Sequence, residues 1–167
     1  MQGSENGIHW LLWAPLGAAI AHIFEEFVLP GGFMTWYRRY RGENNAKITP
    51  RFLIIINAVL LAACVNAATA DDPLGFAYWI GISAILASNG LWHTWAVIKT
   101  RGYSPGLATG ILLYLPLAIY GIVHFLRSNA VSIESAIAAL LIGGSYPLWS
   151  AVFHAKKSSA AEQNESF

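Results

Sequence analysis

Five long stretches of the chain contain no Asp, Glu, Lys or Arg, and each is between 19 and 26 residues long. A helix needs about 20 mostly apolar residues to cross the hydrocarbon core of a bilayer. The pattern therefore predicts five transmembrane helices, at about residues 8–29, 52–70, 74–98, 107–126 and 131–155. Charged residues make up only 11% of the chain. A soluble domain has about 25%, so the composition argues against an ordinary cytosolic enzyme.

The predicted spans occupy most of the chain and leave no room for a separate soluble catalytic domain. We expect an all-α integral membrane protein: a five-helix bundle that forms one transmembrane domain over residues 1–157, followed by a disordered cytoplasmic tail at 158–167. The hydrophobic fraction of 56% excludes a disordered chain. With one cysteine and a net charge of +1, the sequence gives no reason to expect a disulfide framework, nucleic-acid binding or a nucleotide cofactor.

The distribution of basic residues predicts the orientation, because Lys and Arg collect in cytoplasmic loops. Nine of the ten Lys and Arg residues lie between the first and second spans, between the third and fourth, or after the fifth. We therefore expect a multi-pass protein of the cytoplasmic (inner) membrane, with the N-terminus outside and the C-terminus in the cytoplasm. The long loop at 30–51 contains the run Trp36–Arg41, which suits the headgroup zone, either as an anchor or as an anionic-lipid site.

Ionisable residues within membrane helices are costly and are therefore candidates for function. The first span contains the run His22-Ile-Phe-Glu25-Glu26. With about 100° per residue, the two glutamates lie within about 60° of His22 on the helix surface, one on each side. This spacing places an imidazole beside two carboxylates, a geometry that suits a metal ion or a proton relay. The alternatives are a structural hydrogen-bonded knot and a pair of glutamates in the headgroup zone.

Polar residues of other spans are expected at the same depth on the cytoplasmic side. Asn57 in the second span, Asn89 and His93 in the third, and His154 in the fifth reach or approach the layer of His22. We expect Asn89 to orient His93, the alternative being that the asparagines only hold helices together. Imidazoles and carboxylates bind zinc and non-haem iron. The candidate metal ligands are therefore His22, Glu25, Glu26, His93 and His154.

The fourth span is predicted to begin with Ser104 as its N-cap and Pro105 as its first helical residue. The free N–H groups and the dipole at such a helix start favour an anion, so a phosphate or carboxylate headgroup is expected to dock there. The alternative is a plain turn and helix cap. The candidate substrate-binding residues are Asn57, Asn89, Tyr103 and Ser104.

Three motifs, in order along the chain, resemble the HXXEE domain family of bacterial membrane proteins. They are His22-Ile-Phe-Glu25-Glu26, the second histidine in Asn89-Gly-Leu-Trp-His93, and Tyr103-Ser-Pro-Gly106. The resemblance covers about residues 10–155. The family carries no assigned biochemical function, so the resemblance supports a site at these residues and leaves its reaction open.

Of the functions that fit, we favour a small metal-dependent or acid–base membrane enzyme that acts on a lipophilic substrate. Glu25 and Glu26 are its expected acid and base, and His22 and His93 its metal ligands or proton carriers. A divalent metal, zinc or iron, is the expected cofactor. The alternatives are a proton- or metal-coupled transporter and a non-catalytic membrane subunit. Membrane lipids are the expected partners, and a substrate with an anionic headgroup and a homo-oligomer fit the same pattern.

Overall fold

Helices are the only secondary-structure elements in the part of the chain that the structure, a computed structural model, describes: residues 5–42 and 48–147. The all-α prediction is confirmed there, whereas His154 and the tail at 158–167 lie outside the described residues. The elements are α1 (Glu5–Phe27), α2 (Phe33–Arg41), α3 (Pro50–Ala68), α4 (Pro73–Thr100), α5 (Leu107–Thr109), the π-helical segment Gly110–Tyr114, α6 (Leu115–Arg127) and α7 (Ile133–Gly144).

Three helical stretches are long and apolar enough to cross a membrane: Pro50–Ala68, Pro73–Thr100 and Leu107–Arg127. They match the second, third and fourth predicted spans. The helices at the first and fifth predicted spans are α1 and α7, which are not among the three. Helix α7 has 12 residues in the described part of the chain.

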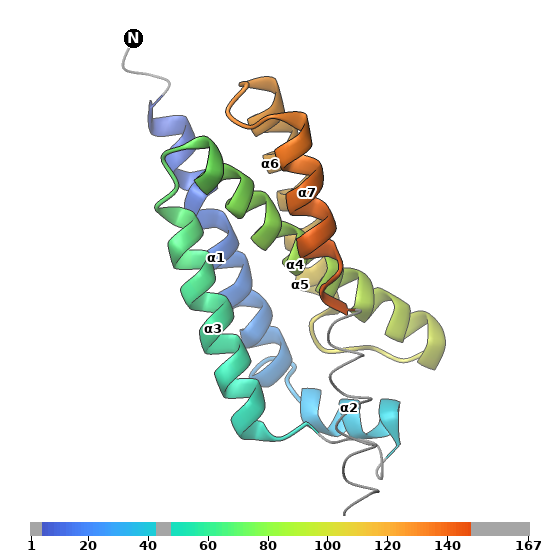
Figure 1. Cartoon of the computed structure of the whole chain (residues 1–167). Coiled ribbons are helices and arrows are strands. Elements are labelled where there is room, and N and C mark those ends of the chain that lie inside the picture. Colours follow the sequence, from blue (N-terminus) through green and yellow to red (C-terminus); the bar gives the residue numbers. More distant parts are fainter. Residues whose placement is uncertain (1–4, 43–47, 148–167) are drawn as a thin grey trace, which may run out of the picture.

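The long helices run alternately up and down, with α4 in the centre against α1, α3, α6 and α7 (Figure 1). Helix starts follow their sequence signals: the side chain of Thr49 accepts a hydrogen bond from the N–H of Phe52, and Asp72 from that of Gly75. Where α4 meets the π-helical segment, a Cβ on Gly90 would lie 2.8 Å from the carbonyl oxygen of Gly110. Only two glycines allow the backbones to approach this closely.

Large apolar side chains cover much of the outer surface of the bundle. Ile54, Leu112, Leu141 and Ile142 are each at least 69% exposed. Soluble monomers rarely expose contiguous apolar surface on this scale. The exposed surface therefore agrees with the three apolar helices in indicating a membrane protein.

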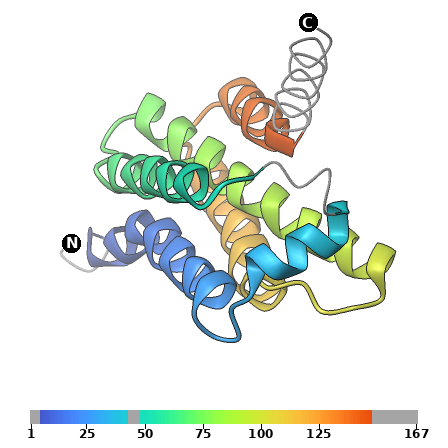
Figure 2. The same cartoon turned by 90° about the horizontal axis from the view of Figure 1, so that it is seen from below.

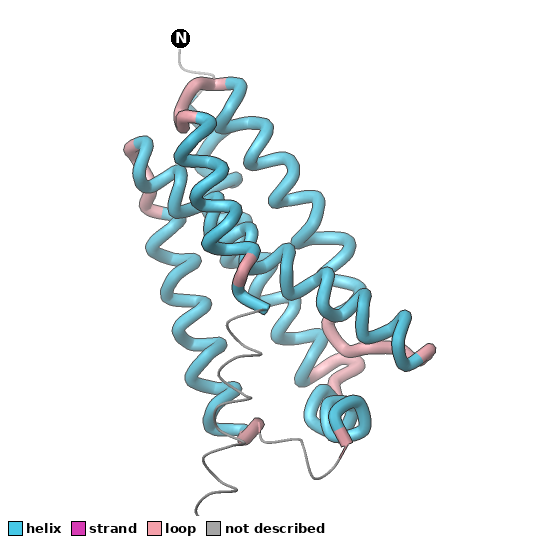
Figure 3. Tube along the Cα trace, turned by 45° about the vertical axis from the view of Figure 1, so that its right-hand side comes forward, coloured by secondary structure: helices cyan, strands magenta, loops and turns pink. Residues whose placement is uncertain are grey.

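The region at 30–51, predicted as a loop, contains helix α2, which lies across the end of the bundle where α1 and α4 end (Figures 2 and 3). Its turns place Phe33 and Tyr37 on one buried face, with their rings stacked 5.8 Å apart. Arg38, Arg39 and Arg41 are exposed. The loop prediction missed this helix because nine residues are too few to show a span-like pattern. A helix this short is stabilised mainly by packing its apolar face against the end of the bundle, and the sequence alone does not show that contact.

Candidate functional site

Three buried side chains from two helices meet at the end of the bundle that α2 covers. Glu26 Oε1 lies 3.6 Å from His22 Nε2, one turn earlier on α1, and 3.2 Å from His93 Nε2 on α4. The three side chains offer ligand atoms that all lie within 4.8 Å of one another. The exposed fractions of His22, Glu26 and His93 are 3%, 7% and 0%. We call these three residues the His–Glu–His cluster.

The hydrogen bonds of His22 fix which of its nitrogens carries the proton. Its Nδ1 lies 2.8 Å from Oγ1 of Thr109, and the Thr109 hydroxyl donates its one proton to Glu25 Oε2, 2.6 Å away. The Thr109 oxygen must therefore accept from His22 Nδ1–H. In the neutral ring the lone pair is then on Nε2, facing Glu26, and the Asn89 amide donates to it over 3.0 Å. Asn89, expected to orient His93, contacts His22 instead.

His93 is held in a matching way. Its Nδ1 lies 2.8 Å from the hydroxyl oxygen of Ser104, while its buried Nε2 has no hydrogen-bond partner among the described residues. A hydroxyl thus positions the Nδ1 of each imidazole, and both Nε2 atoms converge on the same carboxylate oxygen of Glu26. His93 Nε2 thus faces a carboxylate oxygen at 3.2 Å without forming a hydrogen bond to it. A cation bound between these two atoms would satisfy both.

Glu25 lies outside the His–Glu–His cluster. Its Oε1 accepts a hydrogen bond from the hydroxyl of Tyr103. The same oxygen accepts from the N–H groups of Gly106 and Ala108, both at 3.0 Å. Its Oε2 accepts from the N–H of Thr109 at 2.7 Å and from the Thr109 hydroxyl. These five donors, which we call the Glu25 cradle, engage both carboxylate oxygens. The anion expected at the start of the fourth span is thus supplied by the chain itself.

The turn before α5 serves both parts of the site. The expected N-cap role of Ser104 is wrong, because the helix begins at Leu107 with Gly106 as its N-cap and the Ser104 hydroxyl is turned toward His93. Partial burial and the hydrogen bond to the Glu25 carboxylate raise the pKa of Tyr103 to about 12. Its hydroxyl therefore stays protonated and donating at any physiological pH. Tyr103 and Ser104, chosen as substrate-binding candidates, contact Glu25 and His93.

Gly106 and Thr109 are site residues that the sequence did not single out individually. Gly106 has φ +99°, and a Cβ there would lie 2.6 Å from Cε1 of His22 and 2.8 Å from Cε1 of His93. Only glycine both adopts this backbone conformation readily and leaves room for the two imidazoles. The signal available was the glycine of Tyr103-Ser-Pro-Gly106. Nothing in the sequence marked Thr109, because its contacts depend on how α5 meets α1.

Aromatic rings close over the imidazoles on several sides. The ring of Tyr114 lies 4.6 Å from that of His22, and the ring of Trp92 lies 4.9 Å from that of His93. From α2, Phe33 and Trp36 each lie 6.2 Å from His93. The cluster is therefore shielded from water on the α2 side, which strengthens electrostatic interactions within it.

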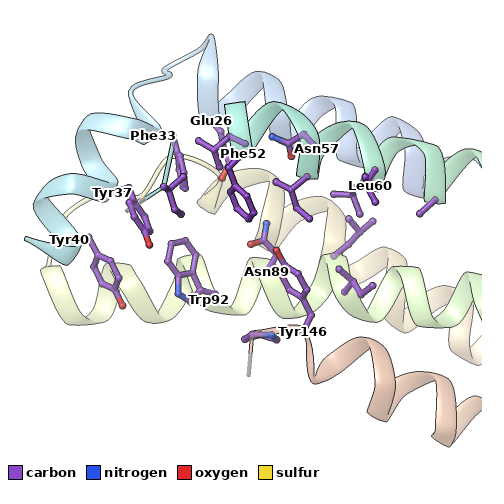
Figure 4. Close-up of a pocket in the computed structure, with 18 of the residues that line it drawn as sticks. Glu26, Phe33, Tyr37, Tyr40, Phe52, Asn57, Leu60, Asn89, Trp92 and Tyr146 are labelled. Atoms are coloured by element: carbon purple, nitrogen blue, oxygen red, sulfur yellow. The ribbon is translucent and has the colours of Figure 1, made fainter. Parts of the chain in front are cut away.

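An open cavity of about 470 Å³, which we call the groove, runs between α3 and α4 and reaches the His–Glu–His cluster at Glu26 (Figure 4). Asn57 and Asn89 also line it, so the two predicted asparagines face the same space. Its walls are otherwise mostly apolar. The lining residues are Glu26, Phe33, Tyr37, Tyr40, Arg41, Ile48, Phe52, Leu53, Ile56, Asn57, Val59, Leu60, Ala63, Ile82, Ile85, Leu86, Asn89, Trp92, Trp95, Tyr146 and Pro147.

Comparison with known proteins gives one match. The family described as "protein of unknown function with HXXEE motif" matches residues 13–121, a range that includes every residue of the His–Glu–His cluster and of the Glu25 cradle. No curated protein and no solved structure matches the chain.

Proposed function

This chain belongs to the HXXEE family, whose function is unknown, and we propose that it is a small membrane enzyme acting on a lipophilic substrate. One observation carries the proposal: Glu26 belongs at once to the buried His–Glu–His cluster and to the wall of an apolar groove. A chemically reactive group at the end of an apolar pocket with a few polar side chains is the usual form of a small-molecule active site.

We propose that the cluster holds a divalent metal ion, with His22 Nε2, His93 Nε2 and an oxygen of Glu26 as its ligands. Two imidazoles and one carboxylate are a donor set for zinc or non-haem iron. A metal held there would polarise a substrate carbonyl or activate water. The protein's part is to keep both Nε2 atoms aimed at Glu26 through Thr109 and Ser104, and to exclude water with the surrounding rings.

The runner-up mechanism uses the same residues without metal. Glu26 would then exchange a proton with His22 or His93 and deliver it to a substrate in the groove, as in an isomerisation or cyclisation. The Glu25 cradle would keep Glu25 ionised and fix the tautomer of His22. Metal analysis separates the two mechanisms.

We propose that the site lies near the cytoplasmic face of the inner membrane, with five spans and the N-terminus outside. In support, the basic residues of α2, of the start of α3 and of the end of α4 belong to the same end of the bundle as the cluster. Helix α2, with its arginines and aromatic rings, suits the headgroup zone. Membrane lipids are then the immediate partners of the chain.

The first experiment is elemental mass spectrometry on protein purified without chelators or a His-tag. We expect near-stoichiometric zinc or iron in the wild type, lost in His22→Ala and in His93→Ala but retained in His124→Ala, a histidine near the other end of the bundle. Metal-free protein with an intact fold would overturn the metal mechanism.

A second experiment tests the enzyme proposal itself. Wild type and Glu26→Gln are incubated with extracted membrane lipids, and the products are profiled by mass spectrometry. Identical lipid profiles for wild type and Glu26→Gln would argue against an enzyme. If the protein also carried ions across the membrane of proteoliposomes, the proposal would change to a transporter.

A further inference from the structure

We propose that the substrate is an amphiphile with a single hydrocarbon chain and an anionic head. The chain would lie in the groove between α3 and α4, its polar middle beside Glu26, and its anionic head at Arg41. This inference rests on the proposed function, since it names the substrate class of the same site.

The inner part of the groove suits one extended chain. Helices α3 and α4 meet at the Ala68–Pro73 turn and diverge toward α2 (Figure 1). Aliphatic side chains of both helices line the groove between them. On α3 the lining runs from Phe52 to Ala63, a length of about 16 Å at 1.5 Å per residue. The aliphatic walls are Leu53, Ile56, Leu60, Ile82, Ile85 and Leu86.

The groove is open toward the side from which a lipid would enter. Phe52, Val59 and Trp95 line it and are each about half exposed. In a bilayer this open side would meet acyl chains, so an amphiphile can enter laterally without crossing water. A lipophilic tail is thus favoured over a compact polar metabolite.

Polar atoms lie in the part of the groove nearest the cluster. Asn57 and Asn89 supply amides there, and Glu26 supplies the carboxylate (Figure 4). Because Asn89 is held by His22, a group that contacts this amide is also close to the cluster. The middle of the substrate, where tail and head meet, would therefore carry the group that reacts.

Positive charge stands at the outer end of the groove, on α2. Arg41 is the one cationic side chain among the described lining residues, and its guanidinium carbon lies 6.0 Å from the ring centroids of both Tyr37 and Tyr40. A carboxylate or phosphate at Arg41 would be paired by charge-assisted hydrogen bonds. Arg38 and Arg39 on the same helix do not line the groove. Lys99 Nζ lies 5.4 Å from the ring centroid of Tyr40 and adds positive charge at the same end.

The test is binding of radiolabelled probes to purified protein in detergent. The anionic probes are palmitate and farnesyl monophosphate, which distinguish a carboxylate from a phosphate head, and the neutral probe is hexadecanol. We expect at least one anionic probe to bind about tenfold more tightly than hexadecanol. We expect Arg41→Gln to remove that advantage while Arg38→Gln keeps it, since a charge-assisted hydrogen bond accounts for about a factor of ten or more.

A second pair of variants tests the tail. Ala63 lines the groove and its neighbour Ala62 does not. Ala63→Phe should weaken binding of palmitate or farnesyl monophosphate about tenfold or more, while Ala62→Phe should leave it unchanged. Size-exclusion profiles and melting temperatures show whether each variant is folded.

The outcomes separate this inference from the proposed function. Equal binding of anionic and neutral probes, or equal effects within either variant pair, would overturn the substrate class while leaving the metal and activity measurements intact. Conversely, selective binding of the anionic probes by a wild-type protein that holds no metal and shows no turnover would keep the ligand class and overturn the enzyme.

Discussion

Glu25 and Glu26 are consecutive residues of one helix, and their surroundings are opposite. The Glu25 cradle supplies five donors, so both oxygens are engaged by the chain itself. Glu26 faces two imidazole nitrogens and an apolar groove. The comparison teaches that a pair of membrane carboxylates need not be a pair of ligands. One can be consumed in building the site while the other remains available for chemistry.

The two regions are coupled through Thr109. Its hydroxyl donates to Glu25 and accepts from His22, whose other nitrogen points at Glu26. The cradle therefore sets the tautomer in the His–Glu–His cluster. The predictions that follow separate these two roles, starting with the largest expected effect.

Replacing Glu26 by Gln should abolish function and leave the fold intact. The amide keeps the shape but loses the negative charge that a metal or a proton relay needs. We expect activity to fall about 10²–10⁴-fold and bound metal to be lost. Lipid product profiles and elemental analysis measure both. A Glu26→Gln protein that keeps its metal and its turnover would remove Glu26 from the reaction.

Replacing Glu25 by Ala should mainly destabilise the protein. Five donors lose their acceptor, including three backbone N–H groups at the start of the helix that runs from Leu107 to Arg127. Hydrogen bonds to a charged group contribute about 1.5–3 kcal/mol each in mutational series, so we expect a loss of about 3 kcal/mol or more. Thermal unfolding in detergent measures it. A melting temperature equal to that of wild type would show that the cradle is not structural.

The residues of the His–Glu–His cluster could be predicted from the sequence, because their positions depend on helical spacing. The run His22-Ile-Phe-Glu25-Glu26 places His22 and Glu26 one turn apart, and their contact follows from that periodicity alone. Counting the rise per residue along the third predicted span placed His93 at the same depth as His22. Both inferences use only the rise and turn of a helix, which hold in a membrane as in water.

The different fates of the two glutamates could not be predicted, because they depend on a tertiary turn. Residues 103–109 wrap their N–H groups around Glu25 only because Gly106 takes a positive φ and Gly110 lets the π-helical segment approach Gly90. No local pattern encodes where that turn meets α1. The same holds for α2, whose short amphipathic face is defined by the bundle end that it covers.

Gly106→Ala should disturb both regions at once. The new Cβ would occupy a strained backbone conformation and collide with both imidazoles. We expect a loss of about 2–3 kcal/mol in stability together with lost metal binding. Gly32→Ala is the matched control, because Gly32 has φ +84° but no atom within 4 Å of the added Cβ. If both variants behave alike, backbone strain alone explains the effect and the imidazole contact does not matter.

Thr109→Val should uncouple the two regions while keeping the shape of the side chain. Without the hydroxyl, Glu25 loses one donor and His22 Nδ1–H loses its acceptor. Changes to groups that orient a metal-bound imidazole typically cost about 10–100-fold in metal affinity, and we expect a change in this range. Thr109→Ser should retain wild-type affinity, as measured by competition with a chelator. Equal affinity in all three proteins would show that the tautomer of His22 does not depend on Glu25.

Tyr103→Phe should have the smallest effect, because it removes one donor of five from the Glu25 cradle and leaves the cluster untouched. We expect a loss of about 1–1.5 kcal/mol in stability and no loss of metal. With the pKa of Tyr103 raised to about 12, the hydroxyl is protonated at lower pH, and its contribution disappears only as the pH rises toward that value. The difference in melting temperature between wild type and variant should therefore be constant from pH 6 to about pH 9. A difference that changes over this range would mean that another group in the Glu25 cradle titrates. Glu25 would then not be a purely structural carboxylate, and the contrast with Glu26 would fail.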